Sequence, residues 1–494
     1  MTAPKPALVE TSTAASVRIE GNEYPLVEIR TTGDILLDVH FKNTSACTKS
    51  IPKDALRSLR TKKLPIPSPR ILYRVKLETI KKHSEYFQIM FKPLFAEGLA
   101  VMKAFSDLES SGLDPTKIEA DKLPRVHIVD EDSITKTFGR EVIFTDMLRV
   151  VHGNDPSTAP FNTQSLTVLV LMADRYNFTS PVTRHMQKIL NAHKYPVGLD
   201  KNGEEALRQK VLIQFHTDQG MRFTGSTKDF ILRGSLRWTD TAESSSEFQA
   251  PWWDLPYGLE GELAYRRACV LRTIASIQDQ FLQIYCSKER QCKLGYDTSS
   301  SCDSFQLGEM IKFLTKKGLL SLVSFQAASP YDSDYVWPEA YSGDIELLIG
   351  ILRQCPQYQI DKNHGHCGLR TKILPALDFI RTCIDTGLGI RLSRSKSGGP
   401  LFESWIPPQV PSSGKKAVWV GNDNEEVDVS GERPKQFYFG QTHSRSVLGR
   451  AAGGNDAGRS PRGLFTAEKW DWVTEQETNP RTVLGGSFMT SIPR

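Results

Sequence analysis

Hydrophobic and polar side chains alternate over three segments in the first third of the chain. These segments are 35–41, 71–77 and 124–130. Successive side chains of a strand point to opposite faces, so a period of two indicates strands whose apolar face packs on a core. Pro124 stands at the start of the third segment, where a strand tolerates the missing N–H. The segment 43–70 is basic and rich in proline, and it is predicted to be a surface loop.

Helical periodicity appears between and after these strands. A short helix is predicted to run into Ser84, whose hydroxyl can accept a hydrogen bond from the first N–H groups of a second helix. A later helix is indicated by apolar residues at positions i, i+3, i+4 and i+7. These residues are Phe144, Met147, Leu148 and Val151. Gly153 is the expected C-terminal end of that helix.

The stretch 166–173 is apolar on nearly every side when it is drawn as a helix. A helix of this kind is buried, and the Asp-Arg-Tyr triplet at 174–176 is predicted to bring its last turn to the surface. The next helix is expected to be capped by Ser180, with Pro181 at its first position. The predicted order is therefore strand, strand, helix, helix, strand, helix, helix, helix.

This order and three short motifs resemble the BTB/POZ domain family. The segment 84–91, SEYFQIMF, is similar to the family's S-x-x-F-x-x-M-F signature, and 173–176, ADRY, is similar to its A-D-K-Y signature. Gly-Asp at 33–34, followed by an alternating strand, looks like the family's opening strand. The resemblance covers roughly 30–192, and it implies an α+β domain in which a small sheet is flanked by helices.

The chain departs from the family at three inserts, 43–70, 98–122 and 132–141. Lys76 or Leu77 also stands where the family often has a histidine. What the resemblance implies is a non-enzymatic adaptor or scaffold with protein partners. Such a protein forms a homodimer, or it docks to a cullin scaffold as a substrate receptor of a ubiquitin ligase. The inserts bear on both partner surfaces, because they can cover them.

One candidate partner site follows from the resemblance. Some family members bind a cullin through a hydrophobic residue followed two positions later by an acid, and Phe144 and Asp146 are loosely similar to that pair. Phe144 also shares a helix face with Met147 and Leu148. The competing interpretation is therefore a core phenylalanine beside a solvated aspartate.

The second half of the chain has the pattern of packed helices. Apolar residues seven positions apart predict one long helix, and they are Leu263, Val270, Ile277 and Ile284. Further helices are predicted at 304–316, 344–354 and 367–385, with Pro375 inside the last one. Parts of this half resemble the C-terminal half of fungal BTB-domain proteins. The sequence KWDWVTEQE, at 469–477, is predicted to be a short docking segment.

The predicted organisation has four parts. Residues 1–20 form a disordered N-terminus, and 21–195 form the BTB/POZ-like domain. Residues 196–392 form an α-helical domain, and 393–494 form a mostly disordered tail, because its composition of Gly, Ser and Pro cannot bury enough apolar surface.

Composition narrows the class of protein. A net charge of +5 on 494 residues is small, so non-specific nucleic-acid binding is not expected. No apolar stretch reaches 18 residues and the start has no apolar signal core, so neither a membrane span nor secretion is expected. The expected location is intracellular, in the cytoplasm or nucleus, where the eight cysteines stay free thiols.

Cysteines and histidines in the second half are candidate ligands for a structural zinc ion, because thiolates and imidazoles suit zinc. The candidates are Cys286, Cys292, Cys302, Cys355, His364, His366 and Cys367. No C-x2-C pair is present, and the spacings match no common zinc finger. The alternative interpretation is a set of buried thiols beside a histidine at a helix start.

No nucleophile elbow, P-loop or dinucleotide fingerprint occurs in the sequence, so an enzyme is not expected. The basic run 57–70 is either a site for nuclear import or an anionic partner, or a solvated loop. A second function therefore stays open beside the adaptor. It is a nuclear regulatory factor whose helical half binds zinc or nucleic acid.

Overall fold

The structure is a computed structural model. It describes residues 16–19, 21–157, 160–198, 200–238, 250–292, 294–295, 297, 299–320, 341–364, 367–368, 370–394, 400–407, 436–439 and 461–473. The chain forms two compact units, the first comprising Met1–Gly220 with Ser245–Leu255 and the second comprising Met221–Ser244 with Pro256–Arg494. Within the described residues, no helix is both long enough and apolar enough to span a membrane.

A five-stranded sheet forms one part of the first unit. Its strands are β1 (Ser16–Ile19), β2 (Asn22–Glu28), β3 (Ile35–Lys42), β4 (Arg70–Val75) and β5 (Arg125–Glu131), in the spatial order β1-β2-β4-β3-β5. β3 runs antiparallel to β4, with Leu37 opposite Tyr73, and parallel to β5, with Val39 opposite Ile128. The three predicted strands are thus confirmed as β3, β4 and β5.

The two N-terminal strands were not predicted. β1 falls within the segment predicted to be disordered, of which residues 1–15 and 20 lie outside the described residues. β2 pairs with β1 on one side and with β4 on the other. Val17 and Leu26 are buried in a small cluster with Leu36 and Leu72 on the central strands. Tertiary packing rather than a regular alternation therefore holds these two strands.

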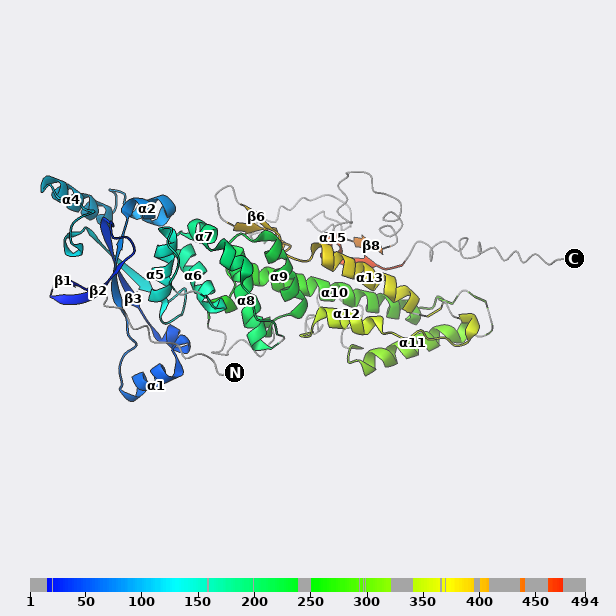
Figure 1. Ribbon diagram of the computed structural model, residues 1–494. Coiled ribbons are helices and arrows are strands. Elements are labelled where there is room, and N and C mark those ends of the chain that lie inside the picture. The colour runs from blue at the N-terminus through cyan, green and yellow to red at the C-terminus, as the bar shows by residue number, and fades with distance from the viewer. Residues whose placement is uncertain are drawn as a thin grey trace, which may run out of the picture. The chain divides into compact units, whose positions relative to one another are not determined.

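The predicted helices lie along the chain as expected, two between β4 and β5 and three after β5 (Figure 1). They are α2 (Leu77–His83), α3 (Glu85–Met90), α5 (Arg140–Val151), α6 (Thr163–Arg175) and α7 (Thr179–Ala192). The central aromatic residue is Phe144 of α5, whose ring centroid lies 5.5 Å from that of Phe41 and 5.3 Å from those of Tyr73 and Tyr176. The sequence-based assignment of Phe144 to the core is confirmed.

Ser84 caps α3 as predicted, and it also joins the two sequence motifs. Its hydroxyl oxygen accepts a hydrogen bond from the Phe87 N–H at 3.1 Å. The same hydroxyl donates to the carbonyl oxygen of Tyr176 at 2.7 Å. The motif at 84–91 therefore holds the end of α6 in place, and its serine has a structural role.

Two details of the α6–α7 region differ from the predictions. Tyr176 is buried rather than exposed, because its ring packs on Phe144 and its hydroxyl donates to Asp130 Oδ1 at 2.8 Å. Ser180 does not cap α7. The first residue of that helix is Thr179, two residues before the predicted first position, with Phe178 at the N-cap and no side-chain cap bond.

Two of the inserts contain helices. The predicted surface loop 43–70 holds a 3-10 helix, Ser45–Ser50, and the helix α1 (Lys53–Thr61), which has no buried residue. The insert at 98–122 contains most of α4 (Ala96–Ser110). α4 packs Val101 and Phe105 on the main core of the first unit, so this insert is an ordered part of the fold.

The first unit extends beyond the predicted limit of residue 195. Helix α8 (Lys201–His216) packs on α6, and the 3-10 helix Pro251–Trp253 returns to α8. Arg208 on α8 is fully buried, donates to the Trp253 carbonyl oxygen at 3.3 Å and lies 4.8 Å from the centre of the Trp253 ring. The first unit therefore continues to Gly220, because α8 packs into the hydrophobic core of that unit.

Helices dominate the second unit. They are most of α9 (Gly220–Arg233), α10 (Leu259–Cys286), α11 (Ser299–Lys316), α12 (Ile345–Arg353) and α13 (Arg370–Gly387). In α10 the predicted apolar row is buried at Leu263, Val270 and Ile277, whereas Ile284 is half-buried. The predicted helices are confirmed, and Pro375 lies inside α13.

Parts of the tail are ordered elements of the second unit. These elements are β6 (Leu392–Arg394), β7 (Pro400–Phe402), β8 (Gln436–Tyr438), α15 (Pro461–Phe465) and β9 (Lys469–Asp471). Trp472, in the predicted docking segment, is buried and bonded to α10. Docking is thus confirmed for 469–473, and 474–477 lie outside the described residues. These ordered elements lie within the tail that was predicted to be mostly disordered, and the rest of the tail falls outside the described residues.

Candidate metal centre

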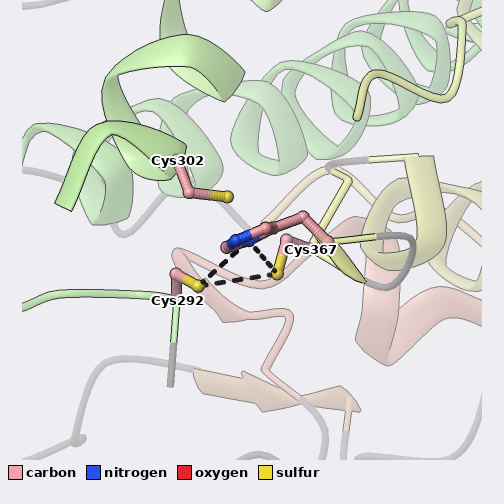
Figure 2. A group of neighbouring side chains, drawn as sticks. Cys292, Cys302 and Cys367 are labelled. Atoms are coloured by element: carbon pink, nitrogen blue, oxygen red, sulfur yellow. Dashed lines mark hydrogen bonds between the residues drawn. The ribbon is translucent and has the colours of Figure 1, made fainter. Parts of the chain in front are cut away.

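Four predicted metal ligands meet in the second unit. Cys292 follows α10, and Cys302 lies in α11. His364 ends a 3-10 helix, Lys362–His364, and Cys367 precedes α13. One ligand atom from each residue lies within 4.8 Å of the corresponding atom of every other. Figure 2 shows the sulfurs of Cys292 and Cys367 on one side of the group and that of Cys302 approaching from another.

Within this Cys3His cluster, the three separations among Cys292, Cys367 and His364 match the edges of a tetrahedral zinc site. The distance from Cys292 Sγ to Cys367 Sγ is 3.7 Å. His364 Nδ1 lies 3.4 Å from Cys292 Sγ and 3.6 Å from Cys367 Sγ. With Zn–S bonds of about 2.3 Å and a Zn–N bond of about 2.0 Å, tetrahedral edges are about 3.8 Å between sulfurs and about 3.5 Å between sulfur and nitrogen. The cluster can therefore hold such an ion with little rearrangement.

None of the sulfurs of the cluster takes part in a disulfide. A disulfide needs sulfurs about 2.05 Å apart, and all eight cysteines are free thiols, as predicted. Burial raises the pKa of Cys367 to about 11, with the neighbouring thiol of Cys292 adding to the effect. Burial also raises the pKa of Cys302, again with help from nearby thiols. In this setting thiolates need a cation beside them, and a divalent metal supplies it.

Two aspartates support the ligand loops. Asp303 accepts hydrogen bonds from the backbone N–H of Gln291 at 2.7 Å and of Cys292 at 3.0 Å, which fixes the first ligand. Asp361 Oδ2 lies 3.9 Å from Nε2 of His364, on the opposite side of the ring from the sulfurs. This separation is too long for a hydrogen bond, so the carboxylate acts on the ring through its negative charge.

The turn that carries His364 and Cys367 is held by its own backbone. The Cys367 N–H donates to the His364 carbonyl oxygen at 3.1 Å. Tyr285, near the end of α10, donates its hydroxyl to the Cys367 carbonyl oxygen at 3.2 Å. Both ligands are thereby placed before any ion binds. This preorganisation lowers the free-energy cost of assembling the site.

Two of the other predicted ligands take no part in this cluster, and the third lies outside the described residues. Cys286 is exposed at the end of α10. Cys355 is buried, but it lies outside the group, and its Sγ faces the Pro356 carbonyl oxygen at 3.7 Å. His366 lies outside the described residues. The sequence thus contains the ligands, and the fold selects four of the seven candidates.

The candidate partner pair Phe144 and Asp146 is not available to a partner. Both side chains are fully buried, with an exposed fraction of 0%. Asp146 Oδ1 accepts hydrogen bonds from the N–H and the hydroxyl of Ser157, at 2.7 and 2.8 Å, so it is not solvated either. The segment after α5 covers this position, and a motif match alone could not reveal that.

Asp361 was not predicted to matter, and a substitution there tests its role. Asp361→Asn is expected to lower zinc affinity by about 10- to 100-fold, because the neutral amide lacks the negative charge that polarises the His364 ring. Competition against a chromophoric chelator measures this affinity. The matched control is Asp385→Asn, which removes a surface ion pair with Lys228 in the same unit. Equal affinities for the two variants would contradict the role of Asp361.

Comparisons with known proteins give no relative. No protein-family model, no curated protein and no solved structure matches the chain.

Proposed function

We propose that the chain is a non-enzymatic protein-interaction protein whose first unit is an adaptor of the BTB/POZ type. Apart from α1 and α4 in the inserts, the elements from β3 to α7 follow the order β3, β4, α2, α3, β5, α5, α6, α7, which supports this proposal because it is the order that the family resemblance implies. The Ser84–Tyr176 hydrogen bond is further support, because it couples the two motifs that carry the resemblance.

The observation that carries the interaction function is a bare apolar face on α3 and α4. Helix α4 has two apolar stripes. Its inner stripe, which includes Val101 and Phe105, packs on the core. The outer face and the turn before it expose large apolar side chains, which continue onto α3. This α3–α4 surface comprises Tyr86, Ile89, Leu94, Phe95, Leu99 and Met102, with Leu94 84% exposed. A helix on a monomer needs one apolar stripe, so a second indicates a partner.

The resemblance gives two classes of partner, a second copy of the chain and a cullin scaffold. Neither can use Phe144 and Asp146, which are buried. The α3–α4 surface offers apolar contacts in their place, and two of its residues, Leu99 and Met102, lie within the 98–122 insert that sets this chain apart from the family. The mechanism is surface complementarity, with no bond made or broken.

Substitutions that introduce charges on the α3–α4 surface test whether it binds a partner. The double variant Leu99→Glu/Met102→Glu is expected to weaken association by about 100-fold or more, because two carboxylates must lose water at the interface. Sedimentation measures self-association of the full chain, and calorimetric titration measures its binding to a cullin N-terminal domain. The control is Val197→Glu, an apolar residue of the same unit that is 85% exposed. Absence of both associations, or binding that the double variant leaves unchanged, would overturn the proposal.

We also propose that the Cys3His cluster binds one structural zinc ion. Three thiolates and an imidazole are soft and borderline donors that favour zinc over magnesium or calcium. The four protein ligands fill a tetrahedral shell and leave no open position for a substrate. The metal therefore stabilises the second unit, which supports the zinc part of the alternative function. The exposed basic helix α1 lies in the first unit, so it gives no support to nucleic-acid binding by the helical half.

A further inference from the structure

The last described segment of the tail, 461–473, lies across two helices of the second unit. Its helix α15 packs on α10 and α13, and β9 contacts α10. Leu464, Phe465 and Trp472 are buried there. The segment has a compact shape of its own, because the Trp470 indole N–H donates to the Leu464 carbonyl oxygen at 2.8 Å.

Polar side chains of α10 bind this segment at both its backbone and its side chains. The Gln280 amide oxygen accepts from the backbone N–H of Trp472 at 2.7 Å, and its nitrogen donates to Asp471 Oδ1 at 3.2 Å. Ser276, one turn earlier, accepts from the Trp472 indole N–H at 2.9 Å. Hydrogen bonds from side chains to the backbone of one short segment are typical of peptide recognition.

Aromatic rings surround Trp472. Phe437 and Phe439 lie 5.6 and 5.7 Å from it between ring centroids. Both also contact Phe379 of α13, at 5.9 and 5.6 Å. Phe437 belongs to β8, which pairs in parallel with β9, so a second piece of the tail completes the pocket. Trp472 is therefore the anchor of the segment.

The other end of the segment fits against a glycine. A Cβ added to Gly387, at the end of α13, would lie 2.5 Å from Cγ and 2.6 Å from Cβ of Pro461. Phe465 stacks on Trp405, with ring centroids 6.0 Å apart. Shape at Gly387 and hydrogen bonds at Gln280 therefore select the two ends of the segment. Together these contacts favour a proline at one end of the bound segment and a tryptophan at the other.

We infer that this face is a peptide-binding groove that the chain fills with its own tail. The groove is formed by Ser276, Gln280 and Gly387, and the rings of Phe437 and Phe439, which pack on Phe379, complete it. Its ligand class is a short peptide with a buried tryptophan, preceded by a proline-led turn that fits Gly387. The contacts are local to 461–473, and residues 440–460 separate this segment from β8 along the chain. The tail segment is thus a separable ligand, and a peptide of the same class supplied by a partner binds in its place.

Cutting the tether in the otherwise full chain tests this inference. A protease site is placed between Gly453 and Gly454, and a fluorescent peptide of residues 459–474 is titrated before and after cleavage. After cleavage the peptide is expected to displace the released fragment. The uncut chain is expected to bind the peptide about 100-fold more weakly, because tethering raises the local concentration of its own segment. A peptide with Trp472→Ala is expected to lose about 100-fold in affinity, since the anchor is gone.

Two glycine variants supply the matched control. Gly387→Ala in the cleaved chain is expected to weaken the peptide by about tenfold, because the new methyl group overlaps the Pro461 ring. Gly350→Ala in α12, where an added Cβ meets no atom within 4 Å, is expected to change nothing. Three results would overturn the inference. The first is a folded, cleaved chain in which the labelled peptide never displaces the tail fragment. The second is a loss of helical circular dichroism on cleavage, and the third is equal peptide binding before and after cleavage.

Discussion

Removing the metal is expected to unfold the part of the second unit that surrounds the Cys3His cluster. The purified chain is expected to contain one zinc ion, and Cys302→Ser or Cys367→Ser is expected to abolish its binding. Structural zinc sites in small domains contribute about 10–16 kcal/mol of binding free energy at neutral pH, so loss of the ion removes a large part of local stability. The ligands come from segments far apart in sequence, and the ion is what would join two buried thiols, one half-buried thiol and a buried imidazole at one point.

Metal analysis by mass spectrometry gives the stoichiometry. Hydrogen exchange over 286–320 and 355–368, with and without a strong chelator, locates the loss of structure. Two cysteines of the same unit provide controls, because Cys286 is exposed and Cys355 is buried outside the cluster. Cys286→Ser and Cys355→Ser are expected to keep the zinc. A native chain that neither contains nor takes up zinc, or a Cys302→Ser variant that retains it, would sink the assignment.

The second large effect is expected at Arg140, at the start of α5. Its side chain is fully buried and pairs with the buried Asp130 at 2.5 Å. It also donates to the backbone carbonyl oxygens of Lys42 at 2.9 Å and Asp130 at 2.8 Å. Arg140→Met is expected to destabilise the first unit by about 3–5 kcal/mol, because it removes one partner of a buried ion pair and deletes the hydrogen bonds to these two carbonyl oxygens.

Hydrogen exchange resolves this effect by unit, which a single melting temperature does not do for a chain of two units. Protection is expected to fall in β5 and α5 and to stay unchanged in α10 and α13. Lys122→Ala breaks the exposed pair with Glu119 and is expected to cost less than about 1 kcal/mol. If Arg140→Met costs no more than this control, the buried pair does not hold the first unit together.

Local patterns predicted much of the first unit. The period of two in β3, β4 and β5, the Ser84 cap and the apolar face of α5 all appear in the structure. Each of these signals depends on residues close together in sequence. β1 and β2 gave no such signal, since their stability comes from Leu36 and Leu72 on other strands. The same limit explains Tyr176 and Asp146, whose burial depends on Asp130 and Ser157.

The metal centre marks the limit of prediction from spacing. The sequence supplied all four ligands among seven candidates, but Cys292 and Cys302 are separated from His364 by much of the unit. Only the packing of α10, α11 and α13 brings them within 4.8 Å. The docked tail was recognised only at 469–477, because Pro461 and Phe465 find their places against Gly387 and Trp405, far away in the sequence.

The return of Ser245–Leu255 to the first unit has a consequence for synthesis on the ribosome. The Trp253 carbonyl oxygen and ring are partners of the buried Arg208, and the Trp252 indole donates to Glu205 at 2.8 Å. These tryptophans leave the ribosome only after the whole of Met221–Ser244, which belongs to the second unit. The segments of the two units therefore alternate in the order of synthesis. The first unit cannot complete its core until residues 221–244 of the second unit have left the ribosome. A nascent chain halted at Gly220 would carry Arg208 without its tryptophan.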